Sequence, residues 1–172
     1  MSLLSRVRER APKLRDYCQA KGYNTHIALF VDLGRHSGLC RFVVWDFDEA
    51  KAIITSPVSH GSGSQTPRKR SCYARVSNDD GSHLSSIGRA LVAERYVGRY
   101  GVAYRLDGLD DTNSNLRKRC VVLHGWEYTT SIPIWPLATV GSFGCPVLSR
   151  RVMARVDTIL QQEKCVVLMT FM

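Results

Sequence analysis

The stretch VGSFGCPVLSRRVMARVDTILQQEKCVVLMTF, residues 140–171, contains a turn, a helix and a strand in that order. Apolar side chains recur at helical spacing over residues 149–164, and Ser149 stands where an N-cap is expected. The apolar run at residues 165–171 predicts a buried closing strand. The turn is unusual because it carries Cys145, whereas structural cysteines commonly lie inside apolar strands or helices. We therefore ask what could activate a thiol in this turn.

Upstream of this stretch, short apolar runs alternate with turns rich in Gly, Ser and Pro. These runs predict strands over residues 26–33, 40–47, 51–59, 88–96, 102–109 and 119–126, with a loop over residues 60–70. Residues 2–21 show helical spacing that Gly22 would stop. Because proline lacks the N–H of a continuous helix, we expect a break at Pro12 or a restart with Pro12 in a first turn. We expect a mainly β protein, a sandwich or partly closed barrel with a helix at each end.

The formal net charge of +9 favours anionic partners such as nucleic acid, membrane surfaces or acidic glycopolymers. Basic residues are densest at residues 5–15 and 66–71 but lack the interleaved aromatic residues of a nucleic-acid groove, so we predict no nucleic-acid partner. No apolar run is long enough for a transmembrane helix. The first ten residues lack the apolar region of a secretory signal, which leaves two readings: a cytoplasmic protein, or an exported one whose leader lies outside this sequence.

The chain has six cysteines and no C-x-x-C pair, a pattern that does not resemble a disulfide scaffold or a zinc ribbon. Cys40, Cys120 and Cys165 each open an apolar run, so we predict that they lie in the core. A zinc site formed by Cys120, His124 and Cys145 is disfavoured, because two residues four apart on a strand are spread by about 13 Å. We predict no metal and no cofactor.

A nucleophilic cysteine needs a nearby base, a cation or a helix N-terminus. His124, at the end of an apolar strand, is the candidate base, and the helix that starts just after Cys145 could contribute its dipole. An ion pair between the two would lower the pKa of the thiol and raise that of the imidazole. The amides of Gly144 and Cys145 could hold an oxyanion, and Ser142 could orient His124 or polarise a carbonyl. A purely structural histidine and an inert turn remain the alternative.

Two motifs, VVLHG at residues 121–125 and GSFGCPVL at residues 141–148, resemble the catalytic signature of the L,D-transpeptidase (YkuD-like) superfamily. The similarity is closest to the branch of murein L,D-transpeptidase catalytic domain proteins. Residues 41–64, with their second HG element, and residues 81–125 also resemble that branch. The resemblance implies an L,D-transpeptidase-like catalytic domain over residues 25–172, preceded by a helical extension at residues 1–24.

The resemblance also implies a mechanism. Such a cysteine attacks the carbonyl at the L-centre of a diamino acid in a peptidoglycan stem peptide, the terminal D-residue leaves, and an amine resolves the thioester. Water in place of the amine gives carboxypeptidase activity. The alternatives are therefore an L,D-carboxypeptidase or amidase, or an inactive murein-binding module. The residues that match the family's motifs are the nucleophile Cys145, the base His124, Ser142 and Gly144 of the S-x-G-C motif, and His60 and Gly61 as site-lining residues.

The sequence departs from the wider superfamily beside the nucleophile. Phe143 and Pro146 stand near the places where that superfamily commonly has a histidine and an arginine. The contact to a substrate carboxylate must then come from elsewhere, and we name Arg105, Arg119 and Arg150 as candidates because an arginine can bind a carboxylate through two N–H groups. The resemblance implies a periplasmic or other cell-envelope location. It leaves open the donor, the acceptor and the oligomeric state.

Overall fold

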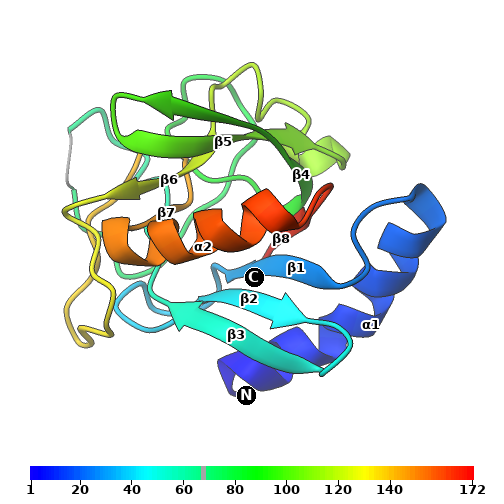
Figure 1. The fold of residues 1–172 in the computed structure, drawn as a ribbon. Helices are drawn as coiled ribbons and strands as arrows, with labels where there is room; N and C mark the ends of the chain where they lie inside the picture. The colour runs from blue at the N-terminus through cyan, green and yellow to red at the C-terminus, as the bar shows by residue number, and fades with distance from the viewer. Residues whose placement is uncertain (67–68) are drawn as a thin grey trace.

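The computed structural model describes residues 1–66 and 69–172; Pro67 and Arg68, in the segment expected to be a loop, lie outside the described residues. The helices within these ranges are α1 (Leu3–Lys21), the short 3-10 helix η1 (Asp111–Asn113) and α2 (Arg150–Gln162) (Figure 1). The strands are β1 (Ile27–Asp32), β2 (Phe42–Asp46), β3 (Lys51–Ser56), β4 (Gly88–Gly98), β5 (Gly101–Gly108), β6 (Val122–Trp126), β7 (Val147–Ser149) and β8 (Val167–Phe171). No helix in the described part of the chain is both long and apolar enough to cross a bilayer.

The strands form one mixed sheet in the order β3-β2-β1-β8-β4-β5-β6-β7. β1 runs parallel to β8 and β6 runs parallel to β7, while the other neighbours are antiparallel. The predicted mainly β architecture is confirmed, although the sheet is not closed into a barrel. The segment after β3 meets β7 at one bridge, where the Ser59 N–H donates to the Val147 carbonyl at 2.8 Å. The two edges of the sheet therefore approach each other close to Cys145.

α1 is an unbroken helix, so the expected break at Pro12 is wrong. Ser2 caps its first turn, and Gly22 ends it with a left-handed φ of 73°. Pro12 lies on the exposed face, where water can satisfy the carbonyl that loses its N–H partner. The opposite face holds the helix on the sheet through the buried side chains of Leu3, Val7, Ala11, Leu14 and Cys18.

The two helices cover opposite faces of the sheet, as Figure 1 shows. On β1, Ala28 and Phe30 pack in the same apolar cluster as α1, whereas Leu29 and Val31 pack in the cluster that contains α2. Consecutive strand residues point to opposite faces, so this alternation separates the two clusters. The central strands are therefore buried on both sides, which explains why their sequences read as continuous apolar runs.

α2 is fixed at its start and its middle. The predicted N-cap is confirmed, because the Ser149 Oγ accepts the Val152 N–H at 3.3 Å. Further along, the Asp157 carboxylate accepts two N–H groups of Arg95 at 2.8 and 2.9 Å and the Tyr104 hydroxyl at 2.6 Å. The Arg95 hydrogen bonds lower the pKa of Asp157. These contacts tie α2 to β4 and β5, and its first residue follows β7 directly.

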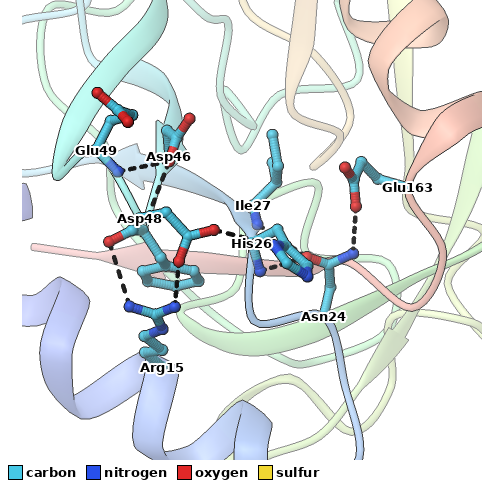
Figure 2. Close-up of polar contacts among 9 residues, drawn as sticks. Arg15, Asn24, His26, Ile27, Asp46, Asp48, Glu49 and Glu163 are labelled. Atoms are coloured by element: carbon cyan, nitrogen blue, oxygen red, sulfur yellow. Dashed lines mark hydrogen bonds and ion pairs between the residues drawn. The ribbon is translucent and has the colours of Figure 1, made fainter.

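The polar contacts in Figure 2 join the start of the chain to two distant segments. Arg15 of α1 pairs with Asp48 in the turn between β2 and β3, and the His26 Nδ1 lies 2.9 Å from the same carboxylate. Hydrogen bonds from His26 and Arg15 lower the pKa of Asp48. The Asn24 side chain donates to the Glu163 Oε2 at 2.8 Å, just after α2. The connection between α1 and β1 is thereby held at several points.

The prediction that Cys120 and Cys165 lie in the core is wrong. Both side chains are exposed, and both residues have left-handed backbones, with φ of 54° and 55°. Each stands just before a strand, and neither belongs to an apolar core cluster. Cys40 is half-buried, and none of the six cysteines forms a disulfide in the structure.

Candidate active site

The turn that carries Cys145 is held by hydrogen bonds from outside and from within. The Ser142 N–H donates to the His60 carbonyl at 2.8 Å, and the Ser62 N–H donates to the Ser142 carbonyl at 3.0 Å. Inside the turn, the Ser142 Oγ donates to the Cys145 carbonyl at 2.6 Å and accepts the Gly144 N–H at 3.2 Å. Ser142 is therefore a brace for the backbone on both sides of the cysteine.

Gly144 is required by both its conformation and its surroundings. Its φ of 117° is a backbone conformation that favours glycine, and a Cβ there would lie 2.9 Å from the Leu84 carbonyl oxygen and 3.2 Å from the Arg119 Nη2. The Ser85 Oγ donates to the Gly144 carbonyl at 2.9 Å. Residues 82–86 consequently pack directly against the turn.

The Cys145 thiol is half-buried and lies against the start of β6. Its Sγ accepts the Val122 N–H at 3.4 Å and is 4.0 Å from the Cys120 carbonyl oxygen. Burial raises the pKa of this thiol, while the Val122 N–H and the positive charge of Arg119 act in the opposite direction. The helix dipole is not among these influences. The strand β7 separates the cysteine from the first residue of α2, and a helix dipole acts mainly within the first turn.

His124 lies on β6, next to the strand that follows the nucleophile, and pairs with Val147 of β7. Its ring is buried, and the Gly125 carbonyl oxygen lies 3.0 Å from its Nδ1. A carbonyl can only accept, so we assign the proton of the neutral ring to Nδ1, which leaves Nε2 as the acceptor. Burial lowers the pKa of His124, and Tyr100 stacks on its ring at 4.9 Å between centroids.

The pKa shifts of Cys145 and His124 are opposite to those expected of an ion pair. Burial raises the pKa of the thiol and lowers that of the imidazole, so both groups rest neutral near pH 7. Within the residues that the structure describes, no hydrogen bond joins the ring to Sγ. The catalytic roles assigned to the pair from the sequence remain predictions.

The amides of Gly144 and Cys145, both proposed as donors to an oxyanion, differ in whether they already donate a hydrogen bond. The Gly144 N–H already donates to Ser142, while the Cys145 N–H has no partner among the described residues. Ser142 itself contacts the turn rather than His124. The Cys145 amide is therefore the better candidate for an oxyanion donor in this conformation.

The second HG element, His60 and Gly61, packs against the turn that carries Cys145. The His60 side chain is buried, and its Nδ1 accepts the Arg41 Nη2–H at 2.6 Å. Burial, followed by the Arg41 charge, lowers the pKa of His60 to about 3, so the ring stays neutral. The Gly61 N–H donates to the Ser85 Oγ at 2.9 Å, and a Cβ on Gly61 would lie 2.4 Å from the His83 carbonyl oxygen. Both residues are thus placed to shape the site through the backbone.

Arg119 is the one of the three candidate arginines that lies beside the nucleophile turn. Its guanidinium is half-buried and makes four hydrogen bonds to oxygens of residues 77–86. The acceptors are the Ser77 carbonyl at 2.9 Å, the Ser86 Oγ at 2.8 Å, the Ser82 Oγ at 3.2 Å and the Leu84 carbonyl. Both terminal nitrogens are therefore already occupied, which argues against a free fork for a substrate carboxylate.

Arg105 and Arg150 are exposed and have other neighbours. The Arg105 guanidinium lies 5.1 Å from the centroid of the Tyr96 ring. Arg150, the first residue of α2, pairs with Glu127 at 3.7 Å. Neither is brought to the thiol by any contact in the described residues, so their substrate-binding role also remains a prediction.

The sequence reasoning assigned no role to two residues at the site. Ser85 connects Gly61 to Gly144 through its hydroxyl, and Tyr100 covers His124. Both belong to residues 81–125, the long block that resembles the family. Two sequence signals for these roles were available. Ser85 and Ser86 form a pair just before Gly88, and Tyr100 lies in a turn between two glycines.

These features define a mainly β domain with helices on both faces of a mixed sheet, and with a cysteine in the turn before β7 and a histidine on the neighbouring strand β6. The chain belongs to the family described as the L,D-transpeptidase catalytic domain, whose model matches residues 5–169. No curated protein matches the sequence.

Several solved structures are similar to this chain in fold. A cysteine-to-serine mutant of an Enterococcus faecium L,D-transpeptidase is 12% identical, with a TM-score of 0.50 over 85% of this chain and 50% of that one. An L,D-transpeptidase from Mycobacterium smegmatis is 11% identical, with a TM-score of 0.51 over 86% and 59%. The helical cell shape determining protein of Campylobacter jejuni is 12% identical, with a TM-score of 0.51 over 91% and 54%. This chain thus spans half or a little more of the length of each.

Proposed function

We propose that this domain is a peptidoglycan-active cysteine acyltransferase, an L,D-transpeptidase that acts on murein stem peptides. One observation carries the proposal: a thiol is held in a braced turn beside the strand of a histidine whose Nδ1 is committed to a carbonyl. Membership of the family supports it. The nucleophile is Cys145 and the base is His124.

In the proposed acylation, the Cys145 Sγ forms a bond to the carbonyl carbon at the L-centre of the diamino acid. The S–H proton passes to the His124 Nε2, and then to the nitrogen of the departing D-residue as its C–N bond breaks. An acceptor amine attacks the resulting thioester, gives a new amide, and returns a proton to Sγ through His124. Because both groups rest neutral, proton transfer accompanies attack instead of preceding it.

The charge that develops on the carbonyl oxygen needs a donor. The Cys145 N–H, which has no partner in the part of the chain that the structure describes, is placed on the reacting residue itself, and a donor of this kind typically contributes 100-fold or more in rate. A second N–H could come from Gly144 if Ser142 released it on substrate binding. The positive charge of Arg119 favours negative charge at the same turn.

The net charge of the chain agrees with an anionic polymer as substrate. Murein carries free carboxylates, and the formal charge of +9 favours encounter with it. Arg105 and Arg150 stay the exposed candidates for a stem-peptide carboxylate, with Arg119 as a candidate only if it exchanges its present partners. A periplasmic or other cell-envelope location is part of this proposal.

The test is product analysis with a stem tetrapeptide, with and without an acceptor amine. Acyl-enzyme formation that is lost in Cys145→Ala and kept in the matched control Cys120→Ala, which removes a neighbouring exposed thiol, supports the nucleophile. A cross-linked product indicates a transpeptidase, and hydrolysis alone indicates the L,D-carboxypeptidase or amidase alternative. Absence of acylation with every stem peptide would favour an inactive murein-binding module.

A further inference from the structure

Three aromatic side chains extend outward from the candidate base. Tyr100, in the turn between β4 and β5, stacks on the His124 ring at 4.9 Å with an interplanar angle of 24°. The Trp126 ring follows at 6.2 Å from Tyr100, and the Tyr128 ring at 5.1 Å from Trp126, both edge to face. We call Tyr100, Trp126 and Tyr128 the aromatic platform. It begins at the catalytic centre and continues past the end of β6.

The platform is not part of the core. Tyr100 and Tyr128 are each 43% exposed, and Trp126 is half-buried, while neither apolar core cluster includes any of the three. The Arg99 guanidinium lies 5.7 Å from the Tyr100 ring centroid, but it belongs to an exposed side chain of the same turn, which can move aside. Exposed aromatic residues gathered beside a catalytic residue are typical of binding surfaces.

We propose that the aromatic platform binds the hexosamine rings of the murein glycan strand; this inference rests on the proposed function. The apolar C–H face of a pyranose ring packs well on a flat aromatic ring, whereas a stem peptide is rich in charged and polar groups. In a tetrapeptide stem, three residues separate the glycan from the scissile bond, and an extended chain of that length spans roughly 10 Å. Successive ring centroids from His124 through Tyr100 and Trp126 to Tyr128 are 4.9, 6.2 and 5.1 Å apart, so the platform offers two further rings beyond the one that contacts the candidate base.

The experiment measures binding in a Cys145→Ala background, where no turnover occurs. The two ligands are a free stem tetrapeptide and the same tetrapeptide linked to its disaccharide, titrated by calorimetry. Tyr128→Ala should weaken binding of the disaccharide form roughly 2- to 12-fold, the size of one aromatic contact, and leave the free peptide unchanged. Tyr73→Ala is the matched control, because Tyr73 is 63% exposed but contacts His36 outside the platform.

Equal binding of the disaccharide form by the parent and Tyr128→Ala, or equal losses on both ligands, would overturn the proposal. If Tyr128→Ala fails to fold, Tyr100→Leu makes the same comparison, since it keeps an apolar cover on His124 and removes the flat ring. The proposed function fails separately. A protein with intact Cys145 that processes neither ligand would contradict it, while the binding comparison would still decide the role of the platform.

Discussion

Replacing Arg119 by methionine should test whether its guanidinium ties residues 77–86 to the nucleophile turn. The side chain makes four hydrogen bonds to that segment and lies next to Gly144. Methionine keeps much of the apolar stem but removes the charge and every donor. Arg119→Lys is the matched variant, because it keeps the charge and loses the fork.

The size of the effect follows from which acceptors lose their donors. A hydrogen bond to a charged group contributes about 1.5–3 kcal/mol, but the side chain is half-buried and the Ser82 and Ser86 hydroxyls can turn to water. The Ser77 and Leu84 carbonyls are fixed by the backbone, so the loss should be about 2–4 kcal/mol. For a domain of this size, that lowers Tm by roughly 4–16 °C.

Differential scanning calorimetry measures this loss, and alkylation of Cys145 by iodoacetamide against pH measures the effect on the thiol. The charge of Arg119 opposes the raised pKa of the thiol, so Arg119→Met should move the reactivity curve to higher pH. Arg119→Lys should lose thermal stability but keep a curve near that of the parent. A methionine variant with the parent's Tm and the parent's curve would refute the reasoning.

Three further predictions concern other parts of the molecule. Gly144→Ala should destabilise the turn by about 1–3 kcal/mol and reduce acylation, because a Cβ cannot fit at a φ of 117°; unchanged melting and acylation would contradict this. Asp157→Asn should lower the free energy of unfolding at pH 7, and the difference from the parent should shrink below about pH 4. The reason is that a carboxylate whose pKa is lowered by folding loses its stabilising contribution as pH falls through that pKa. Urea titrations at pH 7 and 3 measure the difference. Deletion of residues 1–24 should expose the apolar face under α1 and cause aggregation, so a monodisperse truncated protein in size-exclusion chromatography would show that the helix is dispensable.

The sequence predicted the elements well because most of them are continuous apolar runs bounded by glycine and proline. The strands at residues 26–33 and 119–126 contain β1 and β6, and α2 begins after the predicted N-cap at Ser149. The failures have local causes. The helix tolerates Pro12 because its buried stripe lies on the other face, and Cys120 escapes the core because the chain turns at a positive φ just before β6.

The identity of the candidate site residues could be predicted, but their environment could not. Motifs name Cys145 and His124, whereas the pKa of each depends on which distant segments bury it. The partners of Arg119 lie 33 to 42 positions earlier in the chain, a pairing with no local signal. Sequence pattern therefore favoured a charged pair, while three-dimensional burial favours a neutral one.

The pairing of β1 with β8 in the middle of the sheet determines when the sheet can form during synthesis. Among the described residues, the first strand, β1, pairs in parallel with the last, β8, from Ala28 opposite Val167 to Asp32 opposite Phe171. During synthesis β1 emerges long before its partner, so the centre of the sheet cannot close until residues 167–171 have been made. A chain that stops before Val167 would leave both apolar clusters open, and its product would be a target for chaperones and proteases instead of a partly active enzyme.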